Sequence, residues 1–394
     1  MERKKHVCVI TGGYPTPQMP TRYTFLEQLV CSMADMGLDM SVIYPNPLLR
    51  KNKKSVRDNK LFTKQTKKGS VINIYRPDYL NLSNKRILGL SMAQIGNLNF
   101  VKAVNRVLGK MEPRPDILYS HFLAPSGCCA GVLGKKYNIP SFCAFGESEL
   151  WSVSPLNKNK VKEQLNMLTG IVSVSTENKR ILLENGFAKE DNIALFPNGV
   201  AHNLFYIRDR KGSRKKFGFP EDAVIGIFTG NFNETKQPDL LQEAAIQISS
   251  LKMIFIGSGE RSVKGDNILF AGRVLHHEIP DYLAAADFFV LPTLAEGCCN
   301  AVIEAMACGL PIVSSNRAFH NDILSDEYSI RIDPTDVEEI KTAMQFLIDH
   351  PEKRVAMGMA AHAASLQFDV EKRAQSIIQW MISKSGETGN ATAH

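Results

Sequence analysis

Two glutamates, Glu296 and Glu304, carry the clearest chemical signal in the sequence. Glu296 lies in a loop of small residues that follows the apolar run 288–291, and Glu304 falls one turn inside the helix predicted to come next. A helix that starts just past the carboxyl end of a strand presents unpaired N–H groups and a positive dipole end, which suits a phosphate. We therefore expect both carboxylates to face one crevice, where they can accept hydrogen bonds from ligand hydroxyls.

Each glutamate also has a purely structural explanation. Glu304 would interact favourably with the helix dipole, and Glu296 would be a solvated loop residue. Neither role explains the whole string, in which Gly297 and Asn300 precede the helix and Gly-Leu-Pro-Ile-Val follows it. The ligand-binding interpretation is therefore preferred.

The segment 296–313 resembles the E-x7-E signature of family-4 retaining glycosyltransferases. These enzymes have the α/β architecture called GT-B, in which two doubly wound Rossmann-like domains face a central cleft. The resemblance implies that Glu296 is catalytic and approaches hydroxyls of the donor sugar, and that Glu304 binds the ribose of the nucleotide. The residues between the glutamates are expected to line the donor site: Gly297, Cys298, Cys299 and Asn300.

A second motif of this family follows the predicted strand 224–229. Where relatives typically read G-R-L-x-x-x-K-G, this chain keeps Lys236 but has Asn231 in place of the arginine. A fixed cation aimed at a departing diphosphate stabilises the transition state more than the ground state. Lys236 is therefore expected to be catalytic, with Asn231 donating a hydrogen bond and Arg273 compensating for the lost cation. The simpler alternative is an exposed loop lysine.

Two further segments resemble the nucleotide-binding part of the family. Gly257 begins a G-x-G turn after a predicted strand, a weak signal alone because such turns are common. The segment 268–274 looks like the stretch whose backbone hydrogen-bonds the nucleobase. Gly257, Arg273 and Val274 are therefore assigned to donor binding. Val274 would contact the base through its main chain, so its side chain does not identify the base.

The first half contributes candidates for the sugar and the acceptor. His121 ends the predicted strand 117–120, and the matching histidine in relatives lies beside the donor sugar. We expect His121 to position that sugar or the attacking hydroxyl, although a histidine at a strand end is more often a structural residue. Gly13, in the loop after the first predicted strand, would allow close backbone approach to the donor phosphates or the acceptor.

Four other residues are assigned to the acceptor side. Phe145 replaces the histidine of the H-G-x-D segment found in many relatives, so Glu147 or Glu149 is expected to take over its contact with the sugar. Both glutamates would equally suit a solvated helix start. Tyr14 and Arg22 complete the set, and Arg22 would equally suit a surface position.

Several ligand motifs are missing from the sequence. The lack of G-x-G-x-x-G argues against a nicotinamide or flavin dinucleotide, and there is no H-E-x-x-H, Walker loop or D-x-D pair. We therefore expect a metal-independent enzyme without a cofactor. Lys236 and a helix N-terminus would supply the electrostatic stabilisation that a divalent ion gives elsewhere.

The composition indicates a protein of ordinary globular type with two domains. The chain has 394 residues, of which 44% are hydrophobic and 22% charged, and it has no apolar run long enough to cross a bilayer. No signal peptide is recognised at its start. The eight cysteines show no C-x-x-C spacing, which favours a reduced compartment over disulfides or zinc. The expected location is therefore cytoplasmic.

The net charge of +7 is concentrated between Arg50 and Lys68, where only Asp58 opposes a run of lysines and arginines. Such a run is usually a solvated, mobile loop. The functional alternative is attraction to anionic lipids, to which each basic residue contributes about 1 kcal/mol. The protein would then lie at the inner face of the plasma membrane. Nucleic acid is not an expected partner because no pattern of a nucleic-acid-binding module accompanies the charge.

Alternating β-branched runs and amphipathic segments predict parallel sheets covered by helices on both faces. An acceptor-side domain is expected over 1–197 and a donor-binding domain over 198–369, with Pro-Asn-Gly at the join. A helix near 370–386 would cross back to the first domain, and 387–394 would be a flexible tail. Strands are expected at 7–11, 40–44, 71–75, 117–120, 141–145, 171–174 and 193–196, and, beyond the basic stretch 208–220, at 224–229, 253–257, 268–271, 288–291, 312–315 and 329–332.

These features together predict a retaining glycosyltransferase of hexosyltransferase type that uses a nucleoside diphosphate sugar, with UDP the expected nucleotide. The acceptor would be a hydroxyl of a glycan or lipid-linked molecule in surface polysaccharide biosynthesis. Asn231 and Phe145 support an alternative, a weak or inactive homologue that serves as a binding subunit of a polysaccharide-assembly complex. A nucleotide-sugar epimerase of the same fold is a third interpretation, which the E-x7-E string disfavours.

Overall fold

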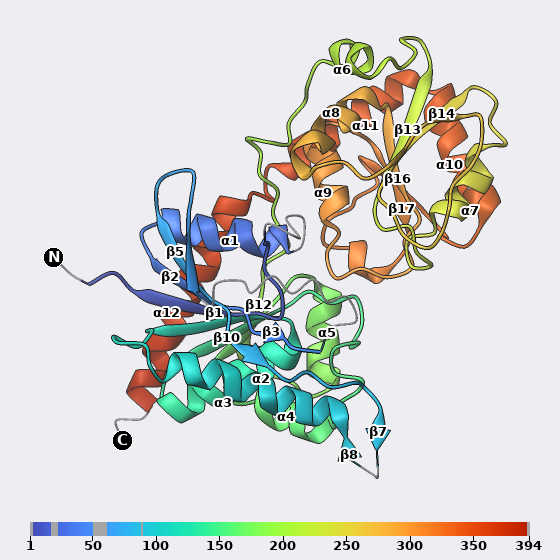
Figure 1. Ribbon diagram of the computed structural model, residues 1–394. Coiled ribbons are helices and arrows are strands. Elements are labelled where there is room, and N and C mark those ends of the chain that lie inside the picture. Colours follow the sequence, from blue (N-terminus) through green and yellow to red (C-terminus); the bar gives the residue numbers. More distant parts are fainter. Residues whose placement is uncertain (1–2, 17–22, 50–60, 88–89, 392–394) are drawn as a thin grey trace. The chain divides into compact units, whose positions relative to one another are not determined.

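The computed structural model describes residues 3–16, 23–49, 61–87 and 90–391. The chain divides into two compact units (Figure 1). The first comprises Met1–Phe196 together with Glu371–His394, and the second comprises Pro197–Val370. Each unit has its own parallel sheet and its own core, so each is described by itself. The predicted α/β fold with two Rossmann-like units is confirmed.

The sheet of the first unit has the strand order β12-β11-β10-β9-β1-β2-β5-β4, in which neighbours are parallel except for the edge strand β4. Branched and aromatic side chains favour these strands because they pack well on a pleated, buried surface. The strands are β1 (His6–Ile10), β2 (Asp39–Ile43), β4 (Leu61–Gln65), β5 (Val71–Tyr75), β9 (Ile117–His121), β10 (Ser141–Phe145), β11 (Gly170–Ser173) and β12 (Ile193–Leu195).

Helices cover both faces of this sheet. They are α1 (Thr24–Asp35), α2 (Met92–Leu108), α3 (Cys128–Tyr137), α4 (Lys158–Leu165), α5 (Thr176–Glu184) and α12 (Val370–Ala391). Alternate side chains of β1 belong to different cores: Val9 packs with α1 and α12, whereas Cys8 packs with α2 and α3. Two small ladders, β3 (Asn46–Pro47) with β6 (Asp78–Tyr79) and β7 (Arg86–Ile87) with β8 (Leu90–Ser91), complete the unit.

The second unit has a six-stranded parallel sheet in the order β15-β14-β13-β16-β17-β18. Its strands are β13 (Val224–Thr229), β14 (Leu251–Ile256), β15 (Ile268–Gly272), β16 (Phe288–Leu291), β17 (Ile312–Ser315) and β18 (Ser329–Ile332). Its helices are α6 (Arg210–Phe217), α7 (Pro238–Ala245), α8 (Ile279–Ala285), α9 (Asn300–Ala307), α10 (Val337–Asp349) and α11 (Pro351–Ser365). The strand order reverses between β13 and β16, and ligands of such sheets bind beyond the carboxyl ends at that point.

The basic run differs from the sequence prediction of a solvated loop. Residues 50–60 lie outside the described part of the chain, but the rest of the run contributes to the folded unit. Leu61–Gln65 forms β4, and Lys64 makes an ion pair with Glu27 of α1. Lys68 lies 3.5 Å from Glu371 at the start of α12. These pairings hold the end of the run against the sheet.

Helix α12 continues through Ala391 and so includes part of the segment 387–394 that was predicted as a tail. No proline interrupts residues 370–391, and the hydroxyl of Ser385 donates to the carbonyl of Met381 at 2.6 Å.

Part of the basic stretch 208–220 folds as α6, whose N-cap Asp209 accepts from the backbone of Lys211 and Gly212 at 3.1 Å each.

The loops after β13 and β14 run against each other at the carboxyl edge of the second sheet. The amide of Gly230 donates to Ile256 O, and that of Phe232 donates to Ser258 O, both at 3.0 Å. Gly257 has φ +151°, and a Cβ there would lie 1.8 Å from the carbonyl oxygen of Gly230. The G-x-G turn therefore has a packing reason: only glycine lets these two backbones approach.

We predict that Gly257→Ala destabilises the second unit by about 3 kcal/mol or more, since the methyl group meets a backbone atom and the backbone angle is strained. Urea unfolding measures the loss. Gly12→Ala is the control, because a Cβ at Gly12 would meet nothing within 4 Å. Equal unfolding midpoints for the two variants would show that the loops can separate without loss of stability.

Candidate functional site

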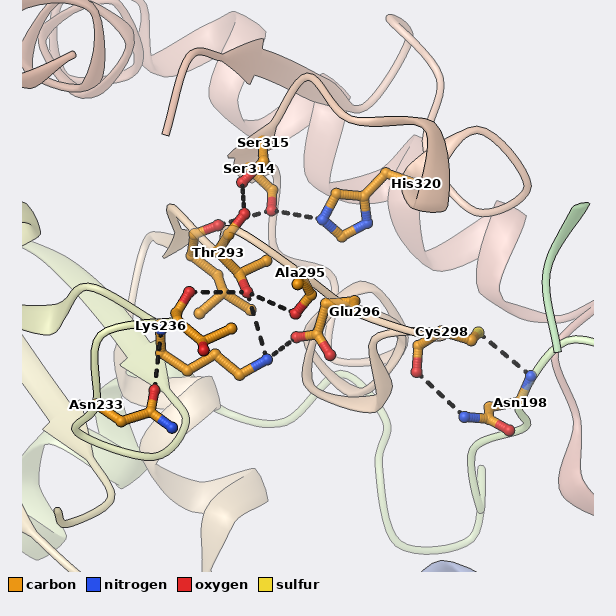
Figure 2. A network of polar contacts seen from close by, with 12 residues as sticks. Asn198, Asn233, Lys236, Thr293, Ala295, Glu296, Cys298, Ser314, Ser315 and His320 are labelled. Carbon is orange, nitrogen blue, oxygen red and sulfur yellow. Dashed lines mark hydrogen bonds and ion pairs between the residues drawn. The ribbon is translucent and has the colours of Figure 1, made fainter. Parts of the chain in front are cut away.

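An ion pair joins two loops where the strand order of the second sheet reverses (Figure 2). Lys236 lies in the loop after β13, and Glu296 lies in the loop after β16. The Nζ of Lys236 contacts the carboxylate of Glu296 and donates to Thr293 Oγ1 at 3.4 Å. Both charged side chains are only 16% exposed. The sequence-predicted cation and carboxylate are thus direct partners at a ligand-binding edge of the sheet.

Further hydrogen bonds fix this pair. Asn233 Oδ1 accepts from the amide of Lys236 at 3.0 Å, and Thr293 Oγ1 lies 3.3 Å from Thr235 O. Ser315 Oγ donates to Thr293 O at 2.6 Å, which ties the loop to β17 (Figure 2). Burial opposes the charge of Lys236, but the carboxylate of Glu296 outweighs burial and raises the pKa of the lysine. The ammonium group therefore stays charged at neutral pH.

The second glutamate makes a contact that the sequence did not predict. Helix α9 spans Asn300–Ala307 as predicted, and Glu304 lies one turn inside it. Its Oε1 is 3.1 Å from Nε2 of His276, which follows β15. The ring of Phe205 packs on that histidine, with 5.3 Å between ring centroids. One sequence feature could have identified His276: it comes directly after the segment that resembles the nucleobase-binding stretch.

The N-terminus of α9 has no side-chain cap in the described structure. Its N-cap residue is Cys299, and the buried Oδ1 of Asn300 has no hydrogen-bond partner among the described residues. Burial and the charge of Glu296 raise the pKa of Cys299 well above its usual value, so the thiol stays neutral. The first N–H groups of the helix therefore meet no competing carboxylate or hydroxyl from the N-cap. Orphaned buried polar atoms at such an end are typical of a ligand site.

The neighbouring Gly297 and Cys298 are buried. Cys298 is bound to the segment that joins the units: its Sγ lies 3.3 Å from the amide of Asn198, and its carbonyl accepts from the side chain of Asn198 at 3.1 Å (Figure 2). None of the eight cysteines, all of them among the described residues, forms a disulfide. Cys298 therefore has a structural role in the loop that carries Glu296.

Three other predicted donor residues lie at the same carboxyl edge of the sheet. Asn231 follows β13 and is exposed, and Val274 follows β15 and is half-buried. Arg273 is exposed, and its Nε donates to Ser258 Oγ in the G-x-G turn. An exposed guanidinium held at this edge can reach an anionic ligand.

In the first unit, His121 is the last residue of β9 and is 5% exposed. Its Nδ1 is buried without a hydrogen-bond partner in the described part of the chain. Burial, assisted by the positive charge of Arg373, lowers the pKa of His121 to about 3. The imidazole is therefore neutral at physiological pH and suits hydrogen bonding rather than charge stabilisation.

Two predicted acceptor-side residues have side chains that lie in the interior of the first unit. Tyr14 is 1% exposed and packs in the core between the sheet and α1, where apolar neighbours surround its ring. Glu147 is 2% exposed, and its carboxylate accepts from Ser152 Oγ at 2.8 Å and from the amide of Leu123 at 3.3 Å. Tyr14 therefore belongs to the apolar core, and Glu147 is held in the interior by these hydrogen bonds.

The other first-unit predictions have mixed outcomes. Glu149 is exposed. Arg22 lies outside the described residues. A Cβ at Gly13 would lie 2.3 Å from the ring of Tyr23, so the glycine makes room for that ring. Phe145 is fully buried, which excludes it from any contact with a ligand in this conformation.

The buried carboxyl of Glu147 predicts a pH dependence of stability. Burial raises its pKa from 4.5 to about 7, so the folded state binds this proton between those values while the unfolded state releases it. Stability then falls as pH rises from 4.5 to 7, by on the order of 3 kcal/mol. Glu147→Gln should lack this fall and be the more stable form at pH 8. Urea titrations of both proteins check it, and parallel pH profiles would contradict it.

The pair of His276 and Glu304 predicts a dependence at higher pH. Burial opposes the charge of His276, but the hydrogen bond and charge of Glu304 outweigh it and raise the pKa above 6.5. The stabilisation is complete below pH 6.5 and lost as pH rises through the folded-state pKa. The free energy of unfolding of the wild type should exceed that of His276→Gln by about 1 kcal/mol at pH 6 and by less at pH 8.5. Urea unfolding at both values measures this, and His277→Gln is the control because His277 is exposed.

The two Rossmann-like units, with a charged site at the switch point of the second, define a GT-B protein. Residues 223–350 match the family model "Glycosyl transferases group 1". The putative teichuronic acid biosynthesis glycosyltransferase TuaC of Bacillus subtilis is 26% identical over 385 residues, which cover 93% of this chain and 96% of that protein. A D-inositol 3-phosphate glycosyltransferase of Acidothermus cellulolyticus is 24% identical and covers 68% of each chain.

Solved structures give the same result for the fold. Sucrose-phosphate synthase from Thermosynechococcus elongatus has a TM-score of 0.77 at 18% identity, covering 96% of this chain and 99% of that one. Anabaena HepE in complex with UDP has a TM-score of 0.71 at 15% identity, covering 96% and 100%. The resemblance stated from the sequence is confirmed: residues 223–350 match the group 1 family model, and the chain has the GT-B fold.

Proposed function

We propose that this protein is a retaining, metal-independent hexosyltransferase that uses a nucleoside diphosphate sugar. The observation that carries the proposal is the buried Lys236–Glu296 pair beside the uncapped start of α9. A lysine and a helix N-terminus together suit a diphosphate, and a neighbouring carboxylate suits sugar hydroxyls. UDP is the proposed nucleotide, supported by the structures of HepE with UDP and with UDP-glucose.

Each donor group takes a distinct role in this proposal. Lys236 and the N–H groups of α9 bind the diphosphate, and exposed Arg273 supplies the cation that Asn231 lacks. Glu304 accepts hydrogen bonds from the ribose, for which it must exchange its contact with His276. Gly257 holds the loops close, and the backbone of Val274 contacts the base.

The proposed transfer breaks the bond between the anomeric carbon and the diphosphate and forms a bond from that carbon to the acceptor oxygen. The acceptor hydroxyl attacks from the face that the diphosphate leaves, and a diphosphate oxygen takes its proton. Lys236 stabilises the charge that develops on the leaving group. Glu296 orients donor hydroxyls, and neutral His121 positions the sugar or the attacking hydroxyl.

The proposed acceptor is a glycan or lipid-linked hydroxyl in surface polysaccharide synthesis, which the name of TuaC supports. The proposed location is the cytoplasmic face of the plasma membrane, reached through the basic run from Arg50 to Lys68. Within the described residues, no helix combines the length and apolar character needed to span a membrane. Two cations of the run, Lys64 and Lys68, make ion pairs within the first unit, although Lys68 and its partner Glu371 are exposed, so mainly the contribution of Lys64 to lipid binding is reduced.

A second candidate is a binding subunit with little or no catalysis. Asn231 motivates it because it removes a cation from the diphosphate site, and Phe145 motivates it because the position that carries a histidine in many relatives is fully buried here. Such a protein would bind UDP but release no sugar from any UDP- or GDP-linked donor. A nucleotide-sugar epimerase would instead return an altered donor, which product analysis separates from transfer.

We predict that Lys236→Ala lowers turnover of the best UDP-sugar by about 100-fold or more, because the leaving group loses its fixed cation. Glu304→Ala should weaken UDP binding about tenfold through loss of the ribose contact. Calorimetry with UDP and a donor screen for hydrolysis and transfer measure both effects, with and without EDTA.

The matched controls are Lys215→Ala and Glu352→Ala, two exposed charges of the second unit. Unchanged UDP affinity and turnover in both site variants would overturn the site assignment. Loss of activity with EDTA would overturn metal independence, and an inverted anomeric configuration in the product would overturn retention.

A further inference from the structure

Five aromatic rings lie together at the switch point of the first unit. The function proposed above assigns a role to one of them, His121, and none to the other four. This aromatic cluster consists of Tyr23, Phe25, His121, Phe122 and Trp151. The rings come from the loop before α1, from α1, from the end of β9 and from the turn after β10. The strand order of the first sheet reverses between β1 and β9, and open α/β sheets bind ligands beyond the carboxyl ends at such a point.

Phe122 lies at the centre of the cluster. Its ring centroid is 4.6 Å from that of His121, at an interplanar angle of 83°, and 5.8 Å from that of Tyr23, at 74°. Trp151 follows at 6.0 Å and 61°, and Phe25 lies 5.0 Å from His121. Edge-to-face contacts of this kind are favourable and fix the rings relative to one another.

The cluster is part of the surface, unlike the aromatic residues of the core. Trp151 is 56% exposed, and Tyr23, Phe25 and Phe122 are half-buried. An exposed indole beside three partly exposed rings makes a contiguous apolar patch, and such patches commonly mark binding sites.

The backbone holds two of the rings in unusual conformations. Phe122 has φ +70° and Tyr23 has φ +60°, values that bulky residues rarely adopt. The amide of Phe122 donates to Ala144 O at 2.9 Å, and its carbonyl accepts from Gly127 at 3.0 Å. The ring of Tyr23 fits only because Gly13 has no side chain. The surrounding structure therefore preorganises the cluster, which favours affinity for a rigid ligand.

We propose that the aromatic cluster is an acceptor subsite in which a pyranose ring stacks on Trp151 and Phe122. The inference rests on the proposed function, since it names the chemistry of the acceptor. A pyranose presents a face of C–H groups to an aromatic ring and a rim of hydroxyls to polar neighbours. The cluster provides both, because the rings of Phe25 and Phe122 lie against the imidazole of His121.

A pyranose fits this surface better than an aliphatic chain does. The Nδ1 of His121 has no hydrogen-bond partner among the described residues, and the residue is 5% exposed. A sugar hydroxyl can satisfy a histidine nitrogen, whereas a lipid tail would leave the imidazole buried without a partner. The neighbouring rings also supply the planar contact that a chain of CH₂ groups does not require.

Tryptophan fluorescence tests the proposal directly because the chain has two tryptophans, Trp151 and Trp380. Trp380 is half-buried and packs on the buried Phe142 of the first unit, at 5.3 Å between centroids. In Trp380→Phe the remaining emission comes from Trp151. We expect methyl glycosides of glucose, galactose, mannose and N-acetylglucosamine to include at least one that shifts this emission saturably. Octanol at matched concentration should not.

A saturable response to octanol and none to any glycoside would overturn the pyranose assignment. If Trp380→Phe does not fold, the same titration is performed on wild type and on Trp151→Phe, and the difference reports Trp151. This measurement requires no donor, so it remains decisive even if no UDP-sugar is turned over. A failure of the proposed function is therefore distinguishable from a failure of the subsite.

Kinetics provide the second test, with the glycoside that binds as acceptor. Trp151→Ala should raise its KM about tenfold, while UDP affinity and donor hydrolysis stay unchanged. Trp151→Tyr should recover most of the loss, since it keeps an aromatic face. Leu98→Ala is the control because it removes another apolar side chain of the same unit that is 52% exposed. An unchanged KM in Trp151→Ala, or an equal rise in Leu98→Ala, would overturn the subsite.

Discussion

The ion pair between Lys236 and Glu296 is the contact on which the charged site depends. It joins the loop after β13 to the loop after β16. Because the second loop leads into α9, the ion pair also fixes the start of that helix. Both groups are largely removed from water, and a buried charge that loses its partner is strongly destabilising. The pair therefore stabilises the two loops that it joins. Thr293 adds a hydrogen bond to the lysine and is itself fixed by Ser315.

Both sheets reverse their strand order at one point, but the side chains that gather at this point differ between the two units. In the second unit the reversal of strand order brings together Lys236, Glu296 and the start of α9, which suit an anion and its hydroxyls. In the first unit it brings together aromatic rings and neutral His121, which suit an uncharged sugar. The two switch points thus present different environments at equivalent positions of two similar sheets: the first is aromatic and neutral, and the second is charged.

Sequence patterns predicted the elements that local chemistry determines. Apolar β-branched runs marked most strands of both sheets, and the string after Glu296 marked α9 at its observed bounds. They did not predict β4, because three of its five residues are polar and its order depends on pairing with β5 and on Glu27. Likewise, the burial of Tyr14 and the contact of His276 with Glu304 arise from elements that are distant in the chain. Residue type indicates what a side chain can do, whereas tertiary packing decides whether it faces a ligand.

The pairing of the charged groups has a consequence for selectivity. Lys236 is paired with Glu296, His276 with Glu304, and Arg273 with Ser258. A ligand gains affinity only by the amount that its contacts exceed these internal ones. A simple anion can replace Glu296 at the lysine but leaves the carboxylate buried without a partner. In the function proposed above, a nucleoside diphosphate sugar would offer phosphate oxygens to the cations and hydroxyls to both carboxylates. On that proposal, the arrangement favours the complete donor over its charged fragments.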